Sequence, residues 1–600
     1  MAWSEVVNVA ATNSGDGTGG PSAGPAEAEA EAGLAPEPAP PAAAAANSRA
    51  PASWLRGRRG RRWLTAAILA ALTGLLYACY VARARSLGID SDGASNVLQA
   101  WDMIHGNPLL RSWWLSDVSF YTTELPEYVL VELAHGLNPG DVYLATAATY
   151  TLLVLLAAVL AKGRATGTEA LLRVLVTVGI MLAPGPRTTA GLLLSSPEHV
   201  GTGVPLLLIW LAIDRLGGRR YLPWLVGVLL TWVQIADQMA VYVGALPVIV
   251  VSAIRLYQFS QHGHVSPHGN GHVSQPEHSS QQGRRAAWLA DAGLLVAAAV
   301  SVPLAAGLVS LIRHAGGFVV APTTTIFATS AQLPHNFWLM VESVLALFGA
   351  DFFGMRPGPL LAVALLRLIA VILAAWACCL AARRLRSERG RLIPILITAI
   401  LINLAAFTFS TQAFDLASAR DISAVLPFSA VLAGRLLPGR AALRALAPAL
   451  LAVAVGYAGI AGYYAGSPRQ PIETQAVAAW LSAHHQTAGL GGYWSANLTT
   501  VATSDRVRVR AVTSSCHRFI PDVWETKKTW YQPPGRATFL VLGLSQVAGA
   551  NGTAAQATAQ FGPPQRNVRI GSYRVMVWNH DLLPALTSGF APGCGPRWRR

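Results

Sequence analysis

The sequence predicts an α-helical membrane protein with about eleven spans, followed by a small α/β domain outside the membrane. Of its 600 residues, 53% are hydrophobic and only 12% are charged, whereas soluble domains carry about 25% charged residues. Apolar stretches recur along the chain, and positive charges gather in the short segments between them. This composition excludes a single soluble domain and a long disordered chain. Five cysteines, with no CxxC pair, are too few for a disulfide scaffold.

Residues 1–55 are predicted to form a disordered cytoplasmic tail. The segment is rich in Ala, Pro, Gly, Ser and Glu, and it has almost no large apolar side chains with which to build a core. The first apolar run begins only at Trp63 and lacks a clear small-residue cleavage site. A cleaved signal peptide is therefore not expected.

Apolar runs approaching the roughly 20 residues that a membrane-crossing helix needs occur throughout residues 56–466. They lie at 63–82, 142–161, 170–184, 200–214, 221–236, 239–257, 288–312, 359–382, 391–410, 422–437 and 443–464. An odd number of spans with a cytoplasmic N-terminus places the C-terminus outside, and the Arg-rich clusters then all fall on cytoplasmic loops. The net charge of +15 therefore indicates topology rather than nucleic-acid binding.

The spans leave three longer loops outside the membrane, at residues 83–141, 185–199 and 313–358. Within the third loop, the apolar residues 337–353 favour a helix at the membrane surface, because a further span would place the later Arg clusters outside. On the cytoplasmic side, residues 258–283 hold five histidines among Gly, Ser and Gln. Their irregular spacing favours a flexible linker over a metal site.

Residues 467–600 have the composition of a soluble domain. Residues 472–485 have helical character. Three segments rich in β-branched residues predict strands, at 507–512, 537–544 and 573–578. We therefore expect a small extracytoplasmic α/β domain. Cys516 and Cys594 both lie in it, where a disulfide could form.

Acidic and aromatic side chains gather in the first external loop. Asp90 and Asp92 follow the first span directly, and residues 94–103 have a helical spacing that includes Asp102. Glu124 lies later in the same loop, after several Trp, Phe and Tyr residues. The loop is too polar to cross the membrane. It is either a binding region or an interfacial aromatic belt with solvated acids.

Other polar side chains lie at the outer ends of later helices. They are Glu198, His199, Asp237, Gln238, Arg420 and Asp421. An ionisable group at the centre of a membrane helix costs roughly 2.5–3.5 kcal/mol on insertion. Each residue alone is explained by a helix end that faces water. The whole set on one face of the bilayer predicts a shared catalytic cavity.

This arrangement resembles the GT-C superfamily of integral-membrane glycosyltransferases, which includes protein O-mannosyltransferases and aminoarabinose transferases. The resemblance covers most of residues 63–464 and rests on Asp90-Ser-Asp92 and on the pattern W-D-x-x-x-G-N-P at 101–108. It is supported by Glu198-His199, the Asp237 turn, helix 337–353 and Arg420. Many relatives carry Asp-Glu or a single Asp after the first span, so the corresponding aspartate stays open. The Ala- and Arg-rich, Lys-poor composition is typical of a bacterial, GC-rich source, and the resemblance implies a relative of the actinobacterial type.

The resemblance implies transfer of a sugar from a polyprenyl-phosphate donor to a hydroxyl of a glycan, lipid or protein acceptor, with inversion, on the outer face of the cell membrane. Asp92 or Asp90 would be the general base. Arg420 would bind the leaving phosphate, because guanidinium suits phosphate geometry. The other candidate substrate-binding residues are Glu198, His199, Asp237, Gln238, Glu124 and Asp102.

The resemblance requires no cofactor, although some relatives use a divalent cation. Asp90, Asp92 and Glu198 would supply oxygen ligands for Mg²⁺ or Ca²⁺, but their spacing does not require such a site. Aromatic side chains in the C-terminal domain form either its core or a carbohydrate surface. They are Trp480, Tyr493, Trp494, Trp524, Trp530 and Tyr531.

Two other functions fit parts of the sequence. A transporter or flippase of lipid-linked sugars would place its polar site near the bilayer midplane, often in repeated halves. The chain shows no convincing internal repeat, but Gly- and Pro-containing spans such as 200–214 fit this alternative. A non-catalytic protein that displays its external domain for envelope assembly would tolerate the loss of Asp90 and Asp92.

Overall fold

The computed structural model describes residues 58–182, 184–185, 188–195, 199–261, 277–322, 326–385, 387–388, 390–436, 440–544, 552–589 and 594–595. The expected tail, most of the His-rich segment and Glu198 lie outside the described residues. The chain divides into two compact units, Met1–Ala67 and Ile68–Arg600. Nearly all described elements belong to the second unit.

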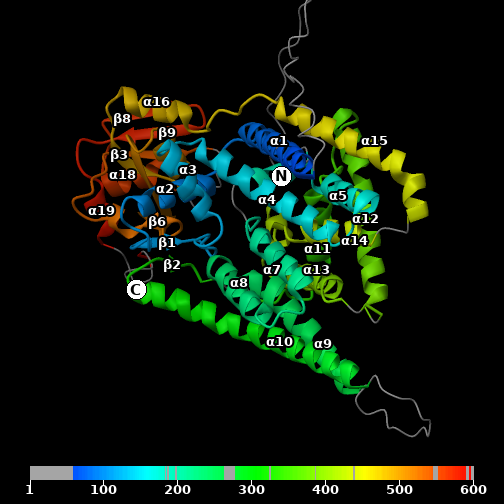
Figure 1. The fold of residues 1–600 in the computed structure, drawn as a ribbon. Coiled ribbons are helices and arrows are strands. Elements are labelled where there is room, and N and C mark those ends of the chain that lie inside the picture. The colour runs from blue at the N-terminus through cyan, green and yellow to red at the C-terminus, as the bar shows by residue number, and fades with distance from the viewer. Residues whose placement is uncertain are drawn as a thin grey trace, which may run out of the picture. The chain divides into compact units, whose positions relative to one another are not determined.

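A helix lies at each of the eleven predicted spans (Figure 1). These helices are α1 (Arg58–Arg85), α4 (Asp141–Lys162), α5 (Gly167–Met181), α7 (Gly203–Leu216), α8 (Leu222–Ala236), α9 (Leu246–Gln261) with the π-helical turn η2 (Val241–Ala245), α10 (Glu277–His314), α12 (Pro359–Arg384), α13 (Leu392–Phe409), α14 (Val425–Arg435) and α15 (Arg440–Ala465). Among the described residues, six helical segments are long and apolar enough to cross a membrane. A seventh is present if the 3₁₀ helix η3 (Leu416–Ile422) and α14 form one bent span.

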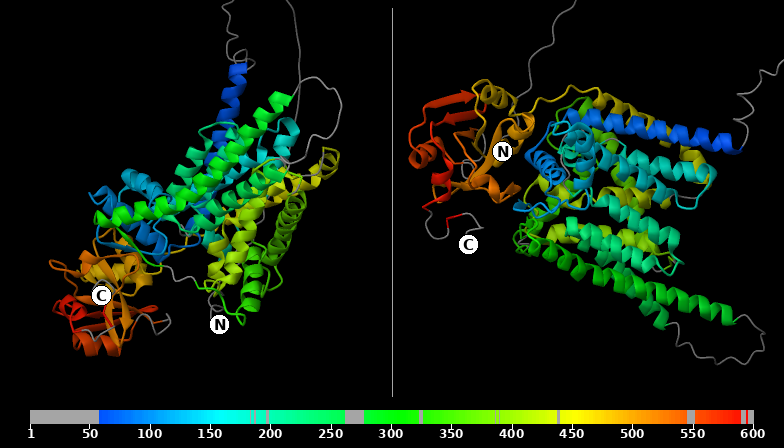
Figure 2. Two further views of the ribbon diagram at one scale, coloured as in Figure 1. Left: turned by 90° about the horizontal axis from the view of Figure 1, so that it is seen from below. Right: turned by 60° about the vertical axis from the view of Figure 1, so that its left-hand side comes forward.

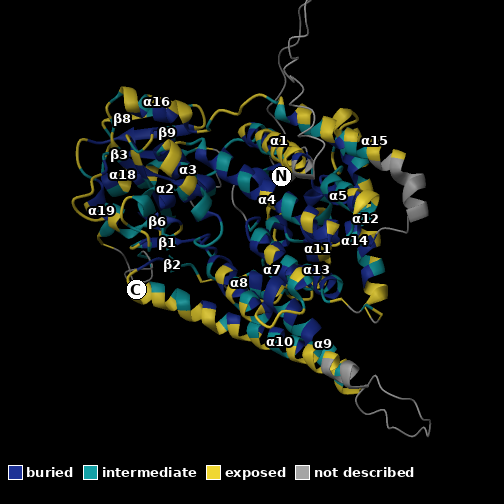
Figure 3. Ribbon diagram, in the orientation of Figure 1, coloured by how far each residue is buried: buried dark blue, intermediate teal, exposed yellow. Residues whose placement is uncertain are grey.

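Apolar side chains on the outer faces of these helices fit a lipid environment. On α10, Val296, Val300, Leu304 and Leu311 are each at least half exposed, and Figure 3 shows exposed residues along its length. In water such a face would be unfavourable, whereas in lipid it is the expected one. The chain is therefore a multi-pass helical membrane protein.

Between the long helices, the connecting loops form short elements. The first loop contains α2 (Ser91–Ile104), β1 (Trp113–Leu115) and α3 (Leu125–His135). The others contain α6 (Thr188–Leu194), β2 (Val319–Val320) and α11 (Leu333–Leu347). The last of these lies where the sequence predicts a surface helix at 337–353. Helix α2 begins at Ser91 because Asp90 caps it, its carboxylate accepting a hydrogen bond of 2.8 Å from the Gly93 N–H.

The C-terminal part contains a six-stranded sheet in the order β5-β4-β3-β7-β9-β8. Its strands are β3 (Ala488–Gly491), β4 (Arg508–Ser515), β5 (Arg518–Pro521), β7 (Phe539–Gly543), β8 (Arg566–Ile570) and β9 (Tyr573–Val577), which gather in one region (Figure 2). The pairs β4–β3 and β3–β7 are parallel and the outer pairs are antiparallel. Three of the strands, β4, β7 and β9, lie at the segments predicted from the sequence.

Alternating side chains give this sheet two apolar faces. On β7, Phe539 and Val541 join one buried cluster, and Leu540 and Leu542 join the other. The helices of this part are α16 (Gln475–Ala483), α17 (Tyr493–Ala502), the 3₁₀ turn η4 (Lys528–Tyr531), α18 (Ala554–Phe561) and α19 (Leu583–Thr587). Cys516 and Cys594 form a disulfide, as the sequence allowed.

A second, three-stranded sheet joins the C-terminal part to the loop that carries α2, β1 and α3. Its order is β2-β1-β6, in which β1 is parallel to β2 and antiparallel to β6 (Thr526–Lys527). Helix α17 also packs directly on α2. These contacts bring residues near 90 and near 500 to the same place, and so assemble the candidate site.

Candidate active site

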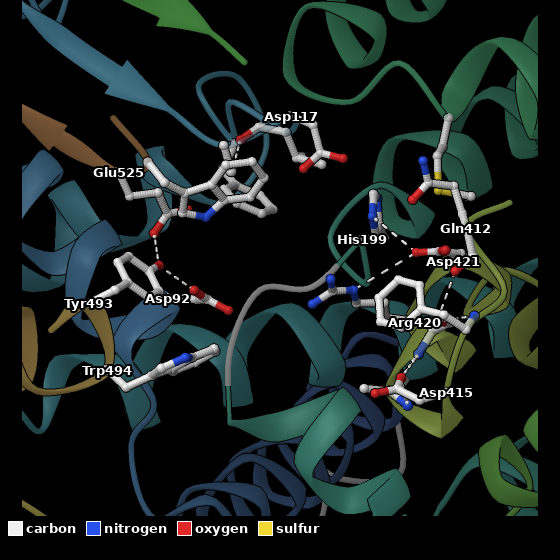
Figure 4. A pocket seen from close by; sticks show the side chains of 18 of the residues that line it. Asp92, Asp117, His199, Gln412, Asp415, Arg420, Asp421, Tyr493, Trp494 and Glu525 are labelled. Atoms are coloured by element: carbon white, nitrogen blue, oxygen red, sulfur yellow. Dashed lines mark hydrogen bonds and ion pairs between the residues drawn. The ribbon is translucent and has the colours of Figure 1, made fainter. Parts of the chain in front are cut away.

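A cavity of about 550 Å³ lies where five distant segments meet (Figure 4). Its size falls in the range of about 300–1,000 Å³ that is usual for ligand sites. The lining side chains come from the first loop, from the turns at His199 and Met239, from residues 412–421, and from the C-terminal part. Two groups of side chains face one another across the cavity, and they are named here the acid wall and the cation wall.

The acid wall consists of Asp92, Tyr493, Trp494 and Glu525. Asp92 lies in the first turn of α2, and its Oδ1 accepts a hydrogen bond from the Tyr493 hydroxyl. The same hydroxyl lies 2.7 Å from Oε2 of Glu525, which is only 2% exposed. Deep burial, followed by the nearby charge of Asp92, raises the pKa of Glu525 well above its ordinary value.

Local hydrogen bonds hold this wall in place. The Ser91 hydroxyl donates to the backbone oxygen of Tyr493 at 2.6 Å, joining the start of α2 to the start of α17. Asp102, further along α2, lies 2.8 Å from the Lys527 ammonium and accepts a hydrogen bond of 2.7 Å from the Trp113 indole. The orientation of Asp92 toward the cavity thus depends on residues of the C-terminal part.

The cation wall consists of His199, Arg420 and Asp421. His199 Nδ1 lies 2.9 Å from Asp237 Oδ2, and its Nε2 lies 3.6 Å from Asp421 Oδ1. Burial alone would lower the pKa of His199. The Asp237 carboxylate, helped by Asp421 and Asp117, outweighs burial and raises the pKa to about 10. His199 is therefore a cation at neutral pH.

Asp237 supports His199 from behind the wall. It accepts hydrogen bonds of 2.5 Å from the Thr202 hydroxyl and 2.8 Å from the Met239 N–H. Because His199 has a positive φ of 56°, a backbone region that L-residues rarely adopt, its position is imposed by its surroundings.

Arg420 lies on η3, with its Nε 3.9 Å from Asp421 Oδ1. Helix η3 begins where the Asp415 carboxylate accepts hydrogen bonds from the Ala417 and Ser418 N–H groups. The side chain of Arg420 is 36% exposed, so its guanidinium reaches the cavity. The cation wall thus presents two positive groups that share one carboxylate.

Of the polar residues predicted from the sequence, four line the cavity: Asp92, His199, Arg420 and Asp421. Asp237 acts through His199, Asp90 caps α2 and Asp102 pairs with Lys527. Gln238 is exposed and does not line the cavity. Glu198 lies outside the described residues.

Glu124 is buried behind the cation wall rather than in the cavity. It accepts hydrogen bonds from the Thr123 hydroxyl and, at 2.9 Å, from the Gly201 N–H. Only glycine fits at position 201, because a Cβ there would lie 2.0 Å from Glu124 Oε1. Burial raises the pKa of Glu124 to about 8. These contacts hold the loop that carries His199.

Of the three predicted oxygen ligands for a divalent cation, Glu198 lies outside the described residues. Asp90 caps a helix, and Asp92 accepts a hydrogen bond from Tyr493. Among the described residues, no group of three or more His, Cys, Asp or Glu side chains is placed to hold a metal ion.

Several lining residues were not predicted as site residues from the sequence. Glu525, Asp117 and Asp522 face the cavity, and no spacing in the sequence connects them with Asp92. The one available signal was the position of Glu525, directly after Trp524 and close to the Lys527-Lys528 pair. Of the six aromatic residues proposed as a carbohydrate surface, Tyr493, Trp494 and Trp524 line the cavity.

No protein-family model and no curated protein matches the sequence. Among solved structures, the chain is similar to ArnT from Cupriavidus metallidurans bound to undecaprenyl phosphate, with 12% identity and a TM-score of 0.47, over 86% of this chain and 97% of that one. It is also similar to the Archaeoglobus fulgidus oligosaccharyltransferase in complex with Zn and sulfate, with 11% identity and a TM-score of 0.40, over 79% of this chain and 68% of that one. The apo form of that enzyme is 10% identical to the chain, with a TM-score of 0.41, over 79% of this chain and 69% of that one. At these identities and TM-scores, the likenesses assign no substrate and no residue role to this chain.

Proposed function

We propose that the chain is a membrane glycosyltransferase that moves a sugar from a polyprenyl-phosphate donor to an acceptor hydroxyl on the outer face of the membrane. The observation that carries the proposal is the cavity itself, in which the Asp92 carboxylate faces two cations, His199 and Arg420 (Figure 4). Group transfer from a phosphate donor needs a base on one side and positive charge on the other. The donor class follows from the resemblance of residues 63–464 to the GT-C superfamily.

In the proposed reaction, the acceptor oxygen attacks the anomeric carbon while Asp92 takes the hydroxyl proton. A bond forms between that oxygen and the carbon, and the bond from the carbon to the phosphate oxygen breaks. The electron pair leaves with the lipid phosphate, whose charge Arg420 and His199 stabilise. Attack opposite the leaving group inverts the configuration at the anomeric carbon. Asp90 is the weaker candidate for the base, because it caps α2 and does not line the cavity.

Aromatic residues that line the cavity favour a glycan as the acceptor. Trp494 is 46% exposed although it lines the cavity, and Trp524 is 38% exposed. Such faces suit stacking against a sugar ring. By contrast, Trp530 packs on Trp113 and Tyr531 is buried. Residues 467–600 would then form a domain that binds the acceptor and closes the cavity.

The proposed topology places the N-terminus in the cytoplasm and the C-terminal domain outside. The Arg-rich clusters between spans support this orientation through the positive-inside rule. The disulfide between Cys516 and Cys594 also fits an oxidising compartment.

A transporter or flippase is the less favoured function. Asp291 of α10 pairs with Arg255 at 3.1 Å and with Arg391 at 2.6 Å. Arg173 pairs with Glu169, and Arg367 donates to the Phe348 backbone oxygen. These three charged side chains within spans, Asp291, Arg173 and Arg367, are thus held by fixed partners rather than arranged as a pathway.

Sugar transfer by the purified protein tests the proposal. The assay supplies radiolabelled polyprenyl-phosphate sugars and a membrane extract, and compares wild type with Asp92→Asn and Asp90→Asn. Loss of a general base typically costs about 10²- to 10⁴-fold in rate, and we expect this for Asp92→Asn. Asp90→Asn serves as the control, because Asn caps helices as well as Asp does. Undiminished transfer by both variants would overturn the assignment.

A further inference from the structure

The acid wall contains two carboxyl groups that share one phenol. Asp92 Oδ1 and Glu525 Oε2 both lie within hydrogen-bonding distance of the Tyr493 hydroxyl. A phenol has one proton and can donate it to only one of them. The second contact is favourable only if one of the two carboxyl groups carries a proton of its own and donates it to the Tyr493 oxygen.

The surroundings indicate that Glu525 carries this proton. Glu525 is 2% exposed, whereas Asp92 is half-buried and lies in the first turn of α2, where the helix dipole favours an anion.

The ionisable groups that interact with Glu525 are Asp92 from α2 and Tyr493 from α17. Hydrogen bonds from the Ser95 and Ser116 hydroxyls lower the pKa of Glu525, but stronger influences outweigh them. Burial, followed by the charge of Asp92, raises the pKa of Glu525 well above its ordinary value. Glu525 also has a positive φ of 48°. The fold therefore holds this residue in an unfavourable backbone conformation.

We propose that Glu525 is held as a neutral acid that donates to Tyr493, and that Tyr493 consequently donates its own proton to Asp92 and fixes its orientation. Glu525 and Tyr493 are then positioning residues for the base. This role rests on the proposed function of Asp92. It also explains how a residue of the first loop depends on side chains about 400 positions later in the chain.

The proton on Glu525 can be measured without any activity assay. The experiment is infrared difference spectroscopy at neutral pH on the full-length protein in lipid nanodiscs, comparing wild type with Glu525→Gln. We expect a band of a protonated carboxylic acid that Glu525→Gln lacks. Glu342→Gln, which changes an exposed residue of α11, is the control and should leave this band unchanged. A carboxylate band in place of the acid band would overturn the proposal.

Transfer kinetics then test the positioning role. Glu525→Gln should lower transfer a few-fold but keep its pH dependence, because the amide still donates to Tyr493, although more weakly than the neutral acid does. Tyr493→Phe should lower transfer about tenfold, since a hydrogen bond to a charged group is lost. Without this donor the ionised base is less stable, so the acidic limb of the pH profile should move to higher pH.

The two experiments separate the two proposals. If Tyr493→Phe matches wild type in rate and pH profile, the positioning role is wrong while the transferase proposal stands. If wild type itself transfers no sugar, the proposed function fails and the positioning role fails with it. The infrared band then still reports whether Glu525 is neutral.

Discussion

The two walls of the cavity differ in how their charges are balanced. On the cation wall, each positive group lies beside a carboxylate, with His199 between Asp237 and Asp421 and with Arg420 beside Asp421. On the acid wall, no described lining residue is a cation, and two carboxyl groups instead share a phenol. Charge is thus balanced by ion pairs on one wall and by protonation on the other. This difference suits one wall to an anionic leaving group and the other to proton transfer.

The cavity as a whole is acidic, which makes its two cations important. Among the described residues that line it, His199 and Arg420 are the only positive groups, and six carboxyl groups accompany them. These are Asp92, Asp117, Asp415, Asp421, Asp522 and Glu525. An anionic donor therefore depends strongly on these two side chains.

Removing Arg420 gives the largest effect expected on the cation wall. Arg420→Gln should lower transfer about 10- to 100-fold, because charge-assisted hydrogen bonds to the leaving phosphate are lost. Binding of polyprenyl phosphate, measured by fluorescence titration, should weaken in parallel. Arg111→Gln is the matched control, because it removes an exposed arginine of the first loop that does not line the cavity. Equal losses in both variants would contradict a specific role for Arg420.

The ion pair of His199 predicts a pH-dependent contribution to stability. The folded-state pKa of about 10 lies above the ordinary value of 6.5, so the contribution is complete below pH 6.5 and disappears as the pH rises to about 10. The difference in Tm between wild type and His199→Gln should therefore be largest near pH 6.5 and shrink toward pH 10. Thermal unfolding followed by intrinsic fluorescence measures it. A difference that stays constant across this range would show that the pair does not hold His199 protonated.

The helices are the part of the fold most directly predictable from the sequence. Backbone groups in lipid must bond within their own segment, so each long apolar run forms a helix. The pairing of β1 with β6, in which Trp113 lies opposite Lys527, could not be predicted. In strands of two or three residues, apolar and polar side chains alternate over too short a length to indicate which face is buried or which strand is the partner.

The sequence indicated which polar residues are candidates for the site, but it did not indicate where their side chains lie. Asp92, His199 and Arg420 stand out as polar groups at the outer ends of apolar runs, and they meet in one cavity. Asp102 and Glu124 stand out in the same way, but they bind Lys527 and Gly201 instead. Polarity shows that an acid is costly to bury. It does not show whether a ligand or the protein provides the acid's partner.

The smallest expected effect tests the acceptor side of the acid wall. Trp494→Ala should raise the KM for a glycan acceptor about two- to tenfold with little change in kcat, because a stacking face contributes to binding rather than to bond making. Trp480→Ala is the control, since Trp480 stacks on His484 and does not line the cavity. An unchanged KM in Trp494→Ala would remove the argument for a glycan and favour a lipid or protein acceptor. A lower kcat at an unchanged KM would instead connect Trp494 with the neighbouring Tyr493, whose ring centroid lies 5.2 Å away, and so with the positioning of Asp92.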